Sequence, residues 1–432
     1  PRHEMEVHVK VGADENGIVK GIKVEALSNA GAYGDHSPTT IGLTGHKAIA
    51  LYRNLDAYAF DYEVVYTNVQ ASGAYRGYGA TQGIYAVESA VNELAHKMNM
   101  DPARIRELNM PIEGEPMYDY DGNLTHTASC TMDRCLARAK EMIGWDEKYP
   151  CRDMGNGKVR GVGLAMAMQG SSIANVDVGG ATLKLNEDAS YTLSLGCADM
   201  GTGCDTILSQ MAVINACNEL KKRIIRLGAE MLGVSPEEAD FDGKKVYAGE
   251  KEVSLQEVAY KGTCGNTLEM QVTASYSSQI SPPPYMVGAA EVEIDKETGN
   301  IDLIDYVAVV DCGTPINPNL ARVQTEGGVA QGIGMALMEN VQYSKEGKIR
   351  ENSFMQYKIP SREDIGNIRV EFESSYEKSG PFGAKSIGEL VIDTPCPAIA
   401  DAVYNASGVR VRELPITSEK VAMGILKKEL EK

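Results

Sequence analysis

The spacing of apolar residues changes along this 432-residue chain, and that change limits the fold more than any other feature. Residues 5–33 alternate apolar and polar side chains on either side of a polar connection at 12–17, which predicts a β-hairpin. Between residues 81 and 98 the apolar side chains recur every three or four positions, which predicts a helix with one apolar face. Strand-like and helix-like segments mix without a regular strand–helix–strand rhythm. The sequence therefore predicts an α+β fold of mixed sheets with packed helices.

Capping, stop and periodicity signals place the other elements. We expect helices at 102–111, 132–143, 205–232, 320–338, 397–406 and 418–430. We expect strands at 181–185 and 191–195 and a hairpin at 290–310. The glycine-rich stretch 155–170 is left without an element. The aperiodic, turn-rich stretch 112–130 is the best boundary, so we divide the chain into domains 1–113 and 114–432.

Charge and cysteine content exclude several classes of function. The chain has 42 Lys and Arg against 60 Asp and Glu, a net charge of −18, which argues against nucleic acid or an anionic membrane as the main partner. No apolar run reaches the roughly 18 residues of a membrane span. Nine scattered cysteines fit reduced thiols in a cytoplasmic protein, and the spacing of Cys130 and Cys135 is not that of a zinc site. The first residues lack an apolar signal core and an initiator Met, which suggests a processed or excised piece.

The first unusual stretch is GAYRGYGATQ at 73–82, directly before the predicted helix. Its glycines let a backbone approach a ligand closely, and the helix start offers free N–H donors. Arg76 adds a planar donor fork suited to anionic oxygens. On these residues alone, a plain strand-to-helix turn with a surface arginine remains an open alternative.

Two further stretches combine glycine with polar residues. The turn at 196–205 could bind a phosphate or a pterin on its amides, although a plain turn and cap explains it equally well. In the loop 380–390, Glu389 lies between small residues, which suits a general base. The alternative there is a glutamate that satisfies a nearby helix start. The six histidines show no metal-ligand spacing.

Taken in order, these stretches resemble the molybdenum-cofactor subunit of the xanthine dehydrogenase/aldehyde oxidase family of molybdenum hydroxylases. The resemblance runs from end to end of the chain but covers only the C-terminal part of such a subunit. It rests on Tyr66-Thr67-Asn68, GAYRGYGATQ (73–82), Asp101-Pro102 with RELN (106–109), GCADMGTG (196–203), Asp311-Cys312-Gly313 with Asn317-Pro318, and GAKSIGEL (383–390) through RVRELPITSEKV (410–421).

The resemblance implies roles for individual residues. Glu389 would be the active-site base, and Arg76 would contact the metal centre through its main chain. The other residues expected at the cofactor are Gly77, Met200, Gly201, Thr202, Gly203, Lys385, Ser386 and Gly388. Those expected at the substrate are Tyr78, Ser171 and Ser172. The carbon monoxide dehydrogenase branch carries a cysteine where this chain has Gly77, which implies that this chain is not of that type.

The implied activity is oxidative hydroxylation of a purine-like N-heterocycle or an aldehyde, with water as the oxygen source. An aromatic residue at Tyr78 favours the flat heterocycle. The implied cofactor is molybdopterin or its cytidine dinucleotide form. Electrons would pass to 2Fe–2S and FAD groups on partner subunits, and the upstream half of the molybdenum subunit would be a further partner.

Two departures from the family pattern leave other functions open. The half of the subunit that precedes this region is absent. In addition, the family has a few dozen residues between segments that correspond to 209–214 and 215–217, and here these two segments are fused. The missing stretch carries pterin-binding turns in the family. A cofactor-free structural or assembly subunit, or an incomplete fragment, is therefore the alternative.

Overall fold

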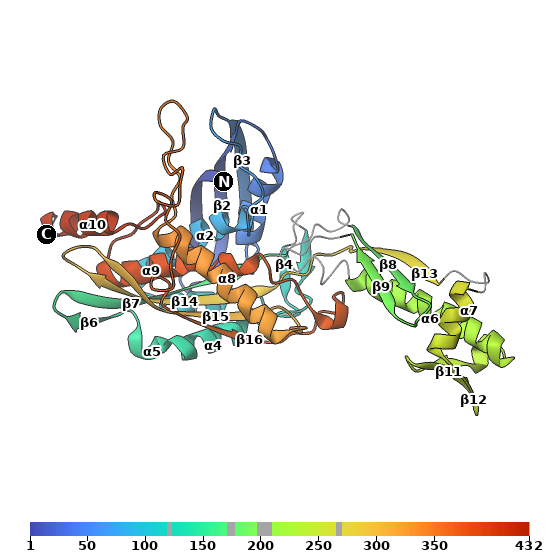
Figure 1. The fold of residues 1–432 in the computed structure, drawn as a ribbon. Helices are drawn as coiled ribbons and strands as arrows, with labels where there is room; N and C mark the ends of the chain where they lie inside the picture. The colour runs from blue at the N-terminus through green and yellow to red at the C-terminus, as the bar shows by residue number, and fades with distance from the viewer. Residues whose placement is uncertain (119–122, 171–177, 197–209, 265–269, 432) are drawn as a thin grey trace. The chain divides into compact units, whose positions relative to one another are not determined.

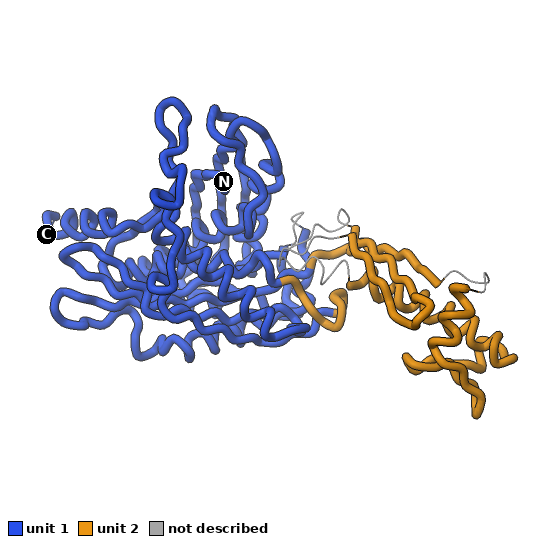
Figure 2. The backbone as a smooth tube through the Cα atoms, in the orientation of Figure 1, with its two compact units in different colours: residues 1–170, 282–377, 387–432 blue, residues 171–281, 378–386 orange. Residues whose placement is uncertain are grey.

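The computed structural model describes residues 1–118, 123–170, 178–196, 210–264 and 270–431. The chain forms two compact units, shown in different colours in Figure 2. Unit 1 contains residues 1–170, 282–377 and 387–432, and unit 2 contains residues 171–281 and 378–386. The second unit is therefore an insertion in the first. The domain division at 113/114 stays a prediction.

The first layer of unit 1 is a three-stranded sheet in the order β1-β2-β3, with two helices packed against it (Figure 1). β1 (Glu4–Ala13) and β2 (Val19–Gly31) form the predicted hairpin, and β3 (Ala57–Tyr66) runs parallel to β2. The predicted helix at 81–98 is confirmed as α2 (Ala80–Lys97). A second helix, α1 (Ser37–Ile49), was not predicted.

Helix α1 depends on packing rather than on helix propensity. Its sequence, SPTTIGLTGHKAI, is rich in threonine and glycine, which are weak helix formers. Glycine permits its close contacts, since a Cβ on Gly45 would lie 2.3 Å from the ring of Phe60. A Cβ on Gly83 of α2 would lie 1.8 Å from the carbonyl oxygen of Thr44. Tertiary contact therefore makes a helix of a segment whose local pattern does not indicate one.

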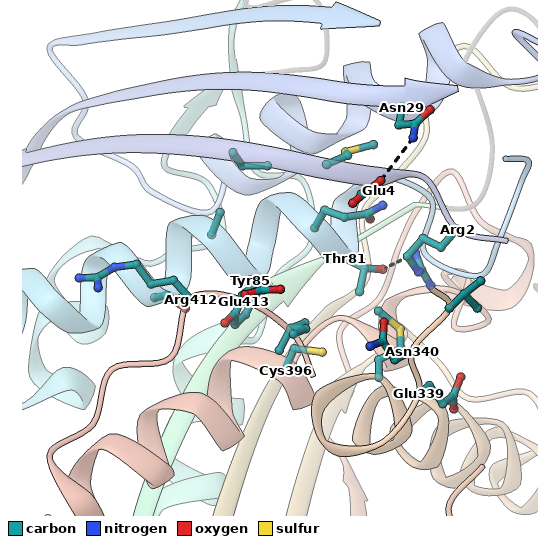
Figure 3. Close-up of a pocket in the computed structure, with 18 of the residues that line it drawn as sticks. Arg2, Glu4, Asn29, Thr81, Tyr85, Glu339, Asn340, Cys396, Arg412 and Glu413 are labelled. Atoms are coloured by element: carbon teal, nitrogen blue, oxygen red, sulfur yellow. Dashed lines mark hydrogen bonds between the residues drawn. The ribbon is translucent and has the colours of Figure 1, made fainter. Parts of the chain in front are cut away.

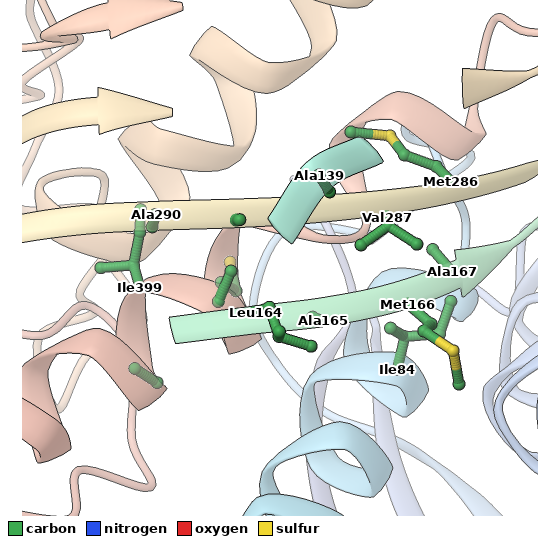
Figure 4. Close-up of a cluster of buried hydrophobic side chains, with 14 of the residues drawn as sticks. Ile84, Ala139, Leu164, Ala165, Met166, Ala167, Met286, Val287, Ala290 and Ile399 are labelled. Atoms are coloured by element: carbon green, nitrogen blue, oxygen red, sulfur yellow. The ribbon is translucent and has the colours of Figure 1, made fainter. Parts of the chain in front are cut away.

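The second layer of unit 1 is a five-stranded sheet in the order β16-β15-β14-β7-β6. The predicted hairpin at 290–310 is confirmed, although both of its strands extend beyond that range. The strands are β6 (Cys151–Gly155), β7 (Lys158–Met168), β14 (Tyr285–Asp295), β15 (Ile301–Asp311) and β16 (Asn367–Phe372). Figure 4 shows side chains of β7 and β14 packed with Ile84 of α2, Ala139 of α4 (Met132–Ile143) and Ile399 of α9 (Pro395–Ser407).

Strand β7 occupies most of the glycine-rich stretch to which the sequence analysis assigned no element. Its glycines serve helix packing rather than a turn. A Cβ on Gly161 would lie 2.4 Å from the carbonyl oxygen of Ala402, and one on Gly163 would lie 2.4 Å from that of Ala398. The glycines therefore let α9 approach the backbone of a central strand.

Among the remaining elements of unit 1, the predicted helices are confirmed as α3 (Pro102–Asn109), α8 (Pro318–Leu337) and α10 (Ser418–Leu430), whereas α5 (Trp145–Lys148) and the short strands β4 (Pro116–Tyr118) and β5 (Leu124–His126) were not predicted. Asp101 caps α3 by accepting from the Ala103 N–H at 2.7 Å. Gly408, at φ 72°, ends α9.

Two residues of the RELN motif have structural roles. Arg106 is fully buried and pairs with the buried carboxylate of Glu88 at 2.7 Å. Glu88 also accepts the Met166 N–H at 2.6 Å. Asn109 accepts the Val19 N–H at 2.8 Å and donates to the Gly17 carbonyl at 2.8 Å. These contacts join α3 to α2, to β7 and to the β1–β2 turn.

Unit 2 has its own core, which includes Leu183, Leu220, Leu227 and Val246. Its sheet has the order β13-β8-β9, and the predicted strands at 181–185 and 191–195 are confirmed. The predicted long helix is confirmed over 210–232, while its expected start at 205–209 lies outside the described residues. The elements are β8 (Val178–Leu185), β9 (Tyr191–Leu195), α6 (Gln210–Leu232), β10 (Asp240–Phe241), β11 (Lys245–Ala248), β12 (Lys251–Ser254), α7 (Leu255–Cys264) and β13 (Gln271–Ser277).

Mixed sheets with packed helices make the predicted α+β class correct. Among the described residues, none of the helices combines the length and the apolar character that crossing a bilayer would require.

Candidate functional site

The turn at 76–78 precedes α2 and has an uncommon backbone. Gly77 and Tyr78 both have positive φ, 81° and 46°. A Cβ on Gly77 would lie 2.3 Å from Thr81 Oγ1 and 2.7 Å from Asp393 Oδ1, so this position requires glycine for space as well as for φ. Tyr78, which has a side chain, holds the left-handed conformation at an energetic cost. Such strain in a native turn must be offset by the contacts around it.

Arg76 braces this turn against two distant segments. Its Nε donates to the Gly388 carbonyl at 2.5 Å, its Nη1 to Gln331 Oε1 at 3.0 Å, and its Nη2 to the Gln324 carbonyl at 3.0 Å. Burial lowers the pKa of Arg76, and the carboxylates of Asp393 and Glu389 oppose that change. The guanidinium group of Arg76 thus donates to three uncharged protein oxygens. From the sequence alone, we expected it either to bind anionic oxygens or to lie on the surface.

Glu389 follows directly after the carbonyl that Arg76 holds. Its side chain is 7% exposed, and it begins the short 3-10 turn η4 (Leu390–Ile392). Glu389 also acts electrostatically on Lys47 of α1: burial lowers the pKa of Lys47 to about 8, and the charge of Glu389 opposes this change. The structure therefore brings Arg76, Gly77 and Gly388 together with Glu389 in unit 1.

A second buried carboxyl, Asp393, lies next to this group and was missed by the sequence analysis. It is fully buried and accepts the Thr81 hydroxyl at 2.7 Å. Its Oδ2 has no hydrogen-bond partner among the described residues. Burial raises the pKa of Asp393 well above its usual range, and Thr81 and Arg2 oppose this change. Only the tertiary fold places it here, four residues beyond Glu389.

Tyr78 lies in the same turn, and its ring meets that of His36 edge to face, with centroids 6.2 Å apart. The remaining predicted site residues belong to unit 2 or lie outside the described residues. Lys385 and Ser386 belong to the segment 378–386 of unit 2. Ser171, Ser172, Met200, Gly201, Thr202 and Gly203 lie outside the described residues.

A large open pocket of about 1380 Å³ lies beside the turn (Figure 3). Arg2, Tyr75, Thr81, Glu339 and Cys396 are among the residues that line it. Arg76, Tyr78 and Glu389 do not line it, so it is distinct from the candidate site.

The residues of unit 1 fit a cofactor held mainly by main chain. Gly388 has no side chain next to the buried Glu389, and Arg76 holds its carbonyl. The buried Oε1 of Gln169, at the end of β7, has no partner within the described part of the chain and is a free acceptor. The described residues contain no cluster of three or more His, Cys, Asp or Glu side chains that could hold a metal ion.

Comparison with known protein families shows the family to which the chain belongs. Residues 1–110 match one molybdopterin cofactor-binding domain family, and residues 138–213 and 206–366 match a second family of the same description. The chain belongs to the molybdopterin cofactor-binding family. The resemblance to the molybdenum subunits of xanthine dehydrogenase and aldehyde oxidase is thereby confirmed.

Individual proteins that are similar to the chain support this family assignment. The chain is 32% identical to the probable hypoxanthine oxidase XdhD of Escherichia coli K12, with 99% of this chain and 49% of that protein covered. It is 28% identical to the putative xanthine dehydrogenase molybdenum-binding subunit XdhA of the same strain, with 97% and 62% covered. Quinoline 2-oxidoreductase from Pseudomonas putida 86 has the same fold, with a TM-score of 0.86, 22% identity, and 98% and 62% covered.

The chain spans about half to three fifths of the length of these relatives. The hypoxanthine oxidase alignment runs over 476 positions against the 432 residues of this chain, a difference of 44. The two matches to the second family overlap at 206–213, which includes most of the first of the two fused segments, 209–214, and ends just before the second, 215–217. Helix α6 begins at Gln210, within the overlap.

Proposed function

We propose that this chain is the molybdopterin-binding part of a molybdenum hydroxylase that hydroxylates a flat N-heterocycle with water as the oxygen source. One observation carries the proposal: Arg76 donates to the Gly388 carbonyl and so couples the turn at 76–78 to Glu389. Domains 1–113 and 114–432 would both contribute to the cofactor site.

Each residue then has a defined task. Glu389 accepts, at a carboxylate oxygen, the proton of the water-derived nucleophile, and its burial keeps competing solvent away. Arg76 holds Gly388 and thereby the direction of the Glu389 side chain. Backbone at Arg76, Gly77, Gly388 and the segments 200–203 and 385–386 would hold the cofactor. When bound, the molybdenum cofactor supplies the two-electron oxidation.

The substrate class follows from Tyr78 and from the relatives. The aromatic ring of Tyr78, in the turn that Arg76 couples to Gly388, offers a face on which a flat heterocycle can stack. The two E. coli relatives are named for hypoxanthine and xanthine, and the structural neighbour is named for quinoline. All three names denote N-heterocycles. An aldehyde is the alternative substrate, and Ser171 and Ser172 would complete the pocket.

We further propose that electrons leave to 2Fe–2S and FAD groups on partner subunits in a cytoplasmic complex. The upstream half of the molybdenum subunit would be supplied by another chain or by a longer form of this one. The share of the relatives that this chain covers supports such a division.

Molybdenum content tests the proposal. It is measured by mass spectrometry on this chain purified alone and after co-expression with the gene directly upstream. We expect about one molybdenum per chain in the co-purified complex. The variant Glu389→Gln should keep the metal and lose turnover by about 100-fold or more, because it removes the proton acceptor. Turnover of Glu389→Gln at the parent rate would contradict the role of Glu389.

The 44-position difference favours a second candidate, a cofactor-free structural or assembly subunit. In that case the pterin-binding turns have been lost and the motifs persist as fold requirements, as Arg106 and Asn109 do. The same measurement separates the two candidates, because a cofactor-free subunit holds no molybdenum either alone or in the complex.

A further inference from the structure

The backbone carbonyls of the turn at 75–78 point in two directions. Those of Tyr75 and Gly77 accept within the turn, from the Tyr78 N–H at 2.7 Å and the Ala80 N–H at 3.1 Å. Those of Arg76 and Tyr78 accept from Arg2 instead. Arg2 Nη2 donates to the Arg76 carbonyl at 2.6 Å, and Arg2 Nη1 donates to the Tyr78 carbonyl at 2.8 Å. A single guanidinium thus satisfies both carbonyls that the turn does not satisfy itself.

We propose that Arg2 is a positioning residue that holds the strained turn at 76–78 and links it to the segment carrying Glu389. This rests on the proposed function only for its consequence in catalysis. The sequence analysis gave Arg2 no role, and no local pattern around it indicates one.

The geometry of the Arg2 guanidinium indicates that it holds the two carbonyls in place, a role that we call a clamp, rather than only supplying a positive charge. Its central carbon, Cζ, lies over the ring of Tyr75, 4.5 Å from the centroid, a cation–π contact that helps to hold the group in place. A planar fork can hold two carbonyls of one turn at a fixed separation, which a point charge on a flexible stem does less well. The contact is therefore specific to arginine.

Strain explains why the turn needs this clamp. Tyr78 has φ 46°, a left-handed conformation that is strained for a residue with a side chain. Without Arg2, two carbonyls in a half-buried site would lose their donor, and the left-handed turn would have fewer contacts to oppose its relaxation. Tyr78 and the backbone of Arg76 would then move away from the positions that the site requires.

The clamp also reaches the other half of the site. Arg2 Nη1 donates to Thr81 Oγ1 at 3.2 Å, an interaction drawn in Figure 3. The Thr81 hydroxyl donates to Asp393 Oδ1 at 2.7 Å. Asp393 directly follows η4, which begins after Glu389. Arg2 and Arg76 therefore connect the same two segments by separate routes, one through Thr81 and Asp393 and one through Gly388.

Hydrogen exchange measured by mass spectrometry tests this without requiring activity. In Arg2→Ala, we expect the amides of Tyr78 and Ala80 to exchange at least tenfold faster than in the parent chain. The matched control is Arg369→Ala, which removes a half-exposed arginine of unit 1 that pairs with Asp305 and donates to the Met142 carbonyl at 2.6 Å. This control should leave exchange at 76–80 unchanged.

Chemical rescue of Arg2→Ala by added guanidinium ion distinguishes the loss of the clamp from a general loss of stability. The Arg2 side chain lines the open pocket, so added guanidinium ion can reach the space that Arg2→Ala leaves. Millimolar guanidinium should restore protection at 76–80, whereas ammonium at the same concentration should not. Parent-like exchange in Arg2→Ala, equal acceleration in Arg369→Ala, or equal rescue by ammonium would each overturn the proposal.

Thr81→Val provides a second variant in case Arg2→Ala does not fold. It keeps the two carbonyl contacts of Arg2 and removes the link to Asp393. We expect faster exchange at Ile392 and Asp393, whose amides bond within η4, and unchanged exchange at Tyr78. The reverse pattern would overturn the proposed route.

The assembled enzyme gives the catalytic consequence. With molybdenum per chain unchanged, Arg2→Ala should lower kcat about tenfold or more, and Arg369→Ala should not. An unchanged kcat in Arg2→Ala would contradict the proposal that Arg2 affects catalysis by Glu389. If the parent complex holds no molybdenum, the proposed function fails, while the exchange comparison still decides the role of Arg2.

Discussion

At Lys47, charge and burial conflict. It lies in the last turn of α1, in a half-buried position, and Glu389 is the charged group that acts on it. Its pKa of about 8 in the folded chain is below the usual value of about 10.4 for lysine. Burial of the ammonium therefore opposes folding whenever Lys47 is charged in the folded state.

Lys47→Met should stabilise unit 1 at pH 7, where the folded parent chain still has to bury the charge. As pH rises from about 8 towards 10.5, the parent loses this proton in the folded state before the unfolded state does, so its stability rises and the difference shrinks. Urea unfolding followed by the fluorescence of Trp145, the one tryptophan of the chain, measures this in unit 1. The exposed Lys10 provides the control substitution, Lys10→Met. A difference that stays constant from pH 7 to 10.5 would contradict the argument.

At the residue scale, sequence patterns reach only part of the candidate site. Glu389 is found because small residues surround it, and Arg76 and Tyr78 because glycines flank them. Arg2, Lys47 and Asp393 carry no such local signal, because each acquires its role from contacts made far away in sequence. Thr81, for example, meets Asp393 across 312 positions.

At the scale of elements, α8 is the helix that supports the site. It packs against η4, and its Gln324 and Gln331 receive two donors of Arg76. Gly328 permits this approach, because a Cβ there would lie 2.3 Å from Val391 Cγ2 and 3.0 Å from Arg76 Cζ. The adjacent Gly327 has nothing within 4 Å of its Cβ position.

This pair of glycines gives a matched test of the helix contact. Gly328→Ala should push α8 away from Val391 and Arg76 and lower turnover of the loaded enzyme about tenfold or more, with loss of stability. Gly327→Ala should instead stabilise the chain by roughly 0.5–1 kcal/mol, because alanine favours a helix over glycine. Turnover and the Trp145 unfolding midpoint are measured for both variants. Equal effects of the two substitutions would show that α8 does not set the site.

Elements with a clear period or cap were predictable, and elements held by packing were not. Helices α4 and α10 match their predicted ranges, 132–143 and 418–430, because one apolar face and clear boundaries define them. Helix α1 and strand β7 were missed for a common reason. Their glycines allow a neighbouring backbone to approach, and this close contact, which the sequence does not show, stabilises the element.

At the scale of the whole molecule, the described residues form two hydrophobic cores. Leu227 of α6 is fully buried in the core of unit 2, and Val287 of β14 is fully buried in that of unit 1. Since each core stabilises its own elements, truncation in one should act mainly on that unit.

Leu227→Ala should cost unit 2 about 2–5 kcal/mol and speed amide exchange in α6 and β8. The Trp145 fluorescence transition, which reports unit 1, should keep its urea midpoint. Val287→Ala is the reciprocal variant, and we expect it to lower that midpoint and to leave exchange in α6 unchanged. A shift of the Trp145 midpoint in Leu227→Ala would show that the two cores unfold as one.

Because unit 2 is inserted in unit 1, the two halves of unit 1 are separated in time during translation. β7 pairs with β14 and packs against α9, but residues 171–281 are made between β7 and β14. While those residues emerge, the apolar β7 pairs with β6 but lacks both its other strand partner, β14, and the helix α9. Translation of unit 2 therefore prolongs the time during which an exposed apolar strand can associate with other nascent chains. Chaperone binding during synthesis should concentrate on residues 158–168.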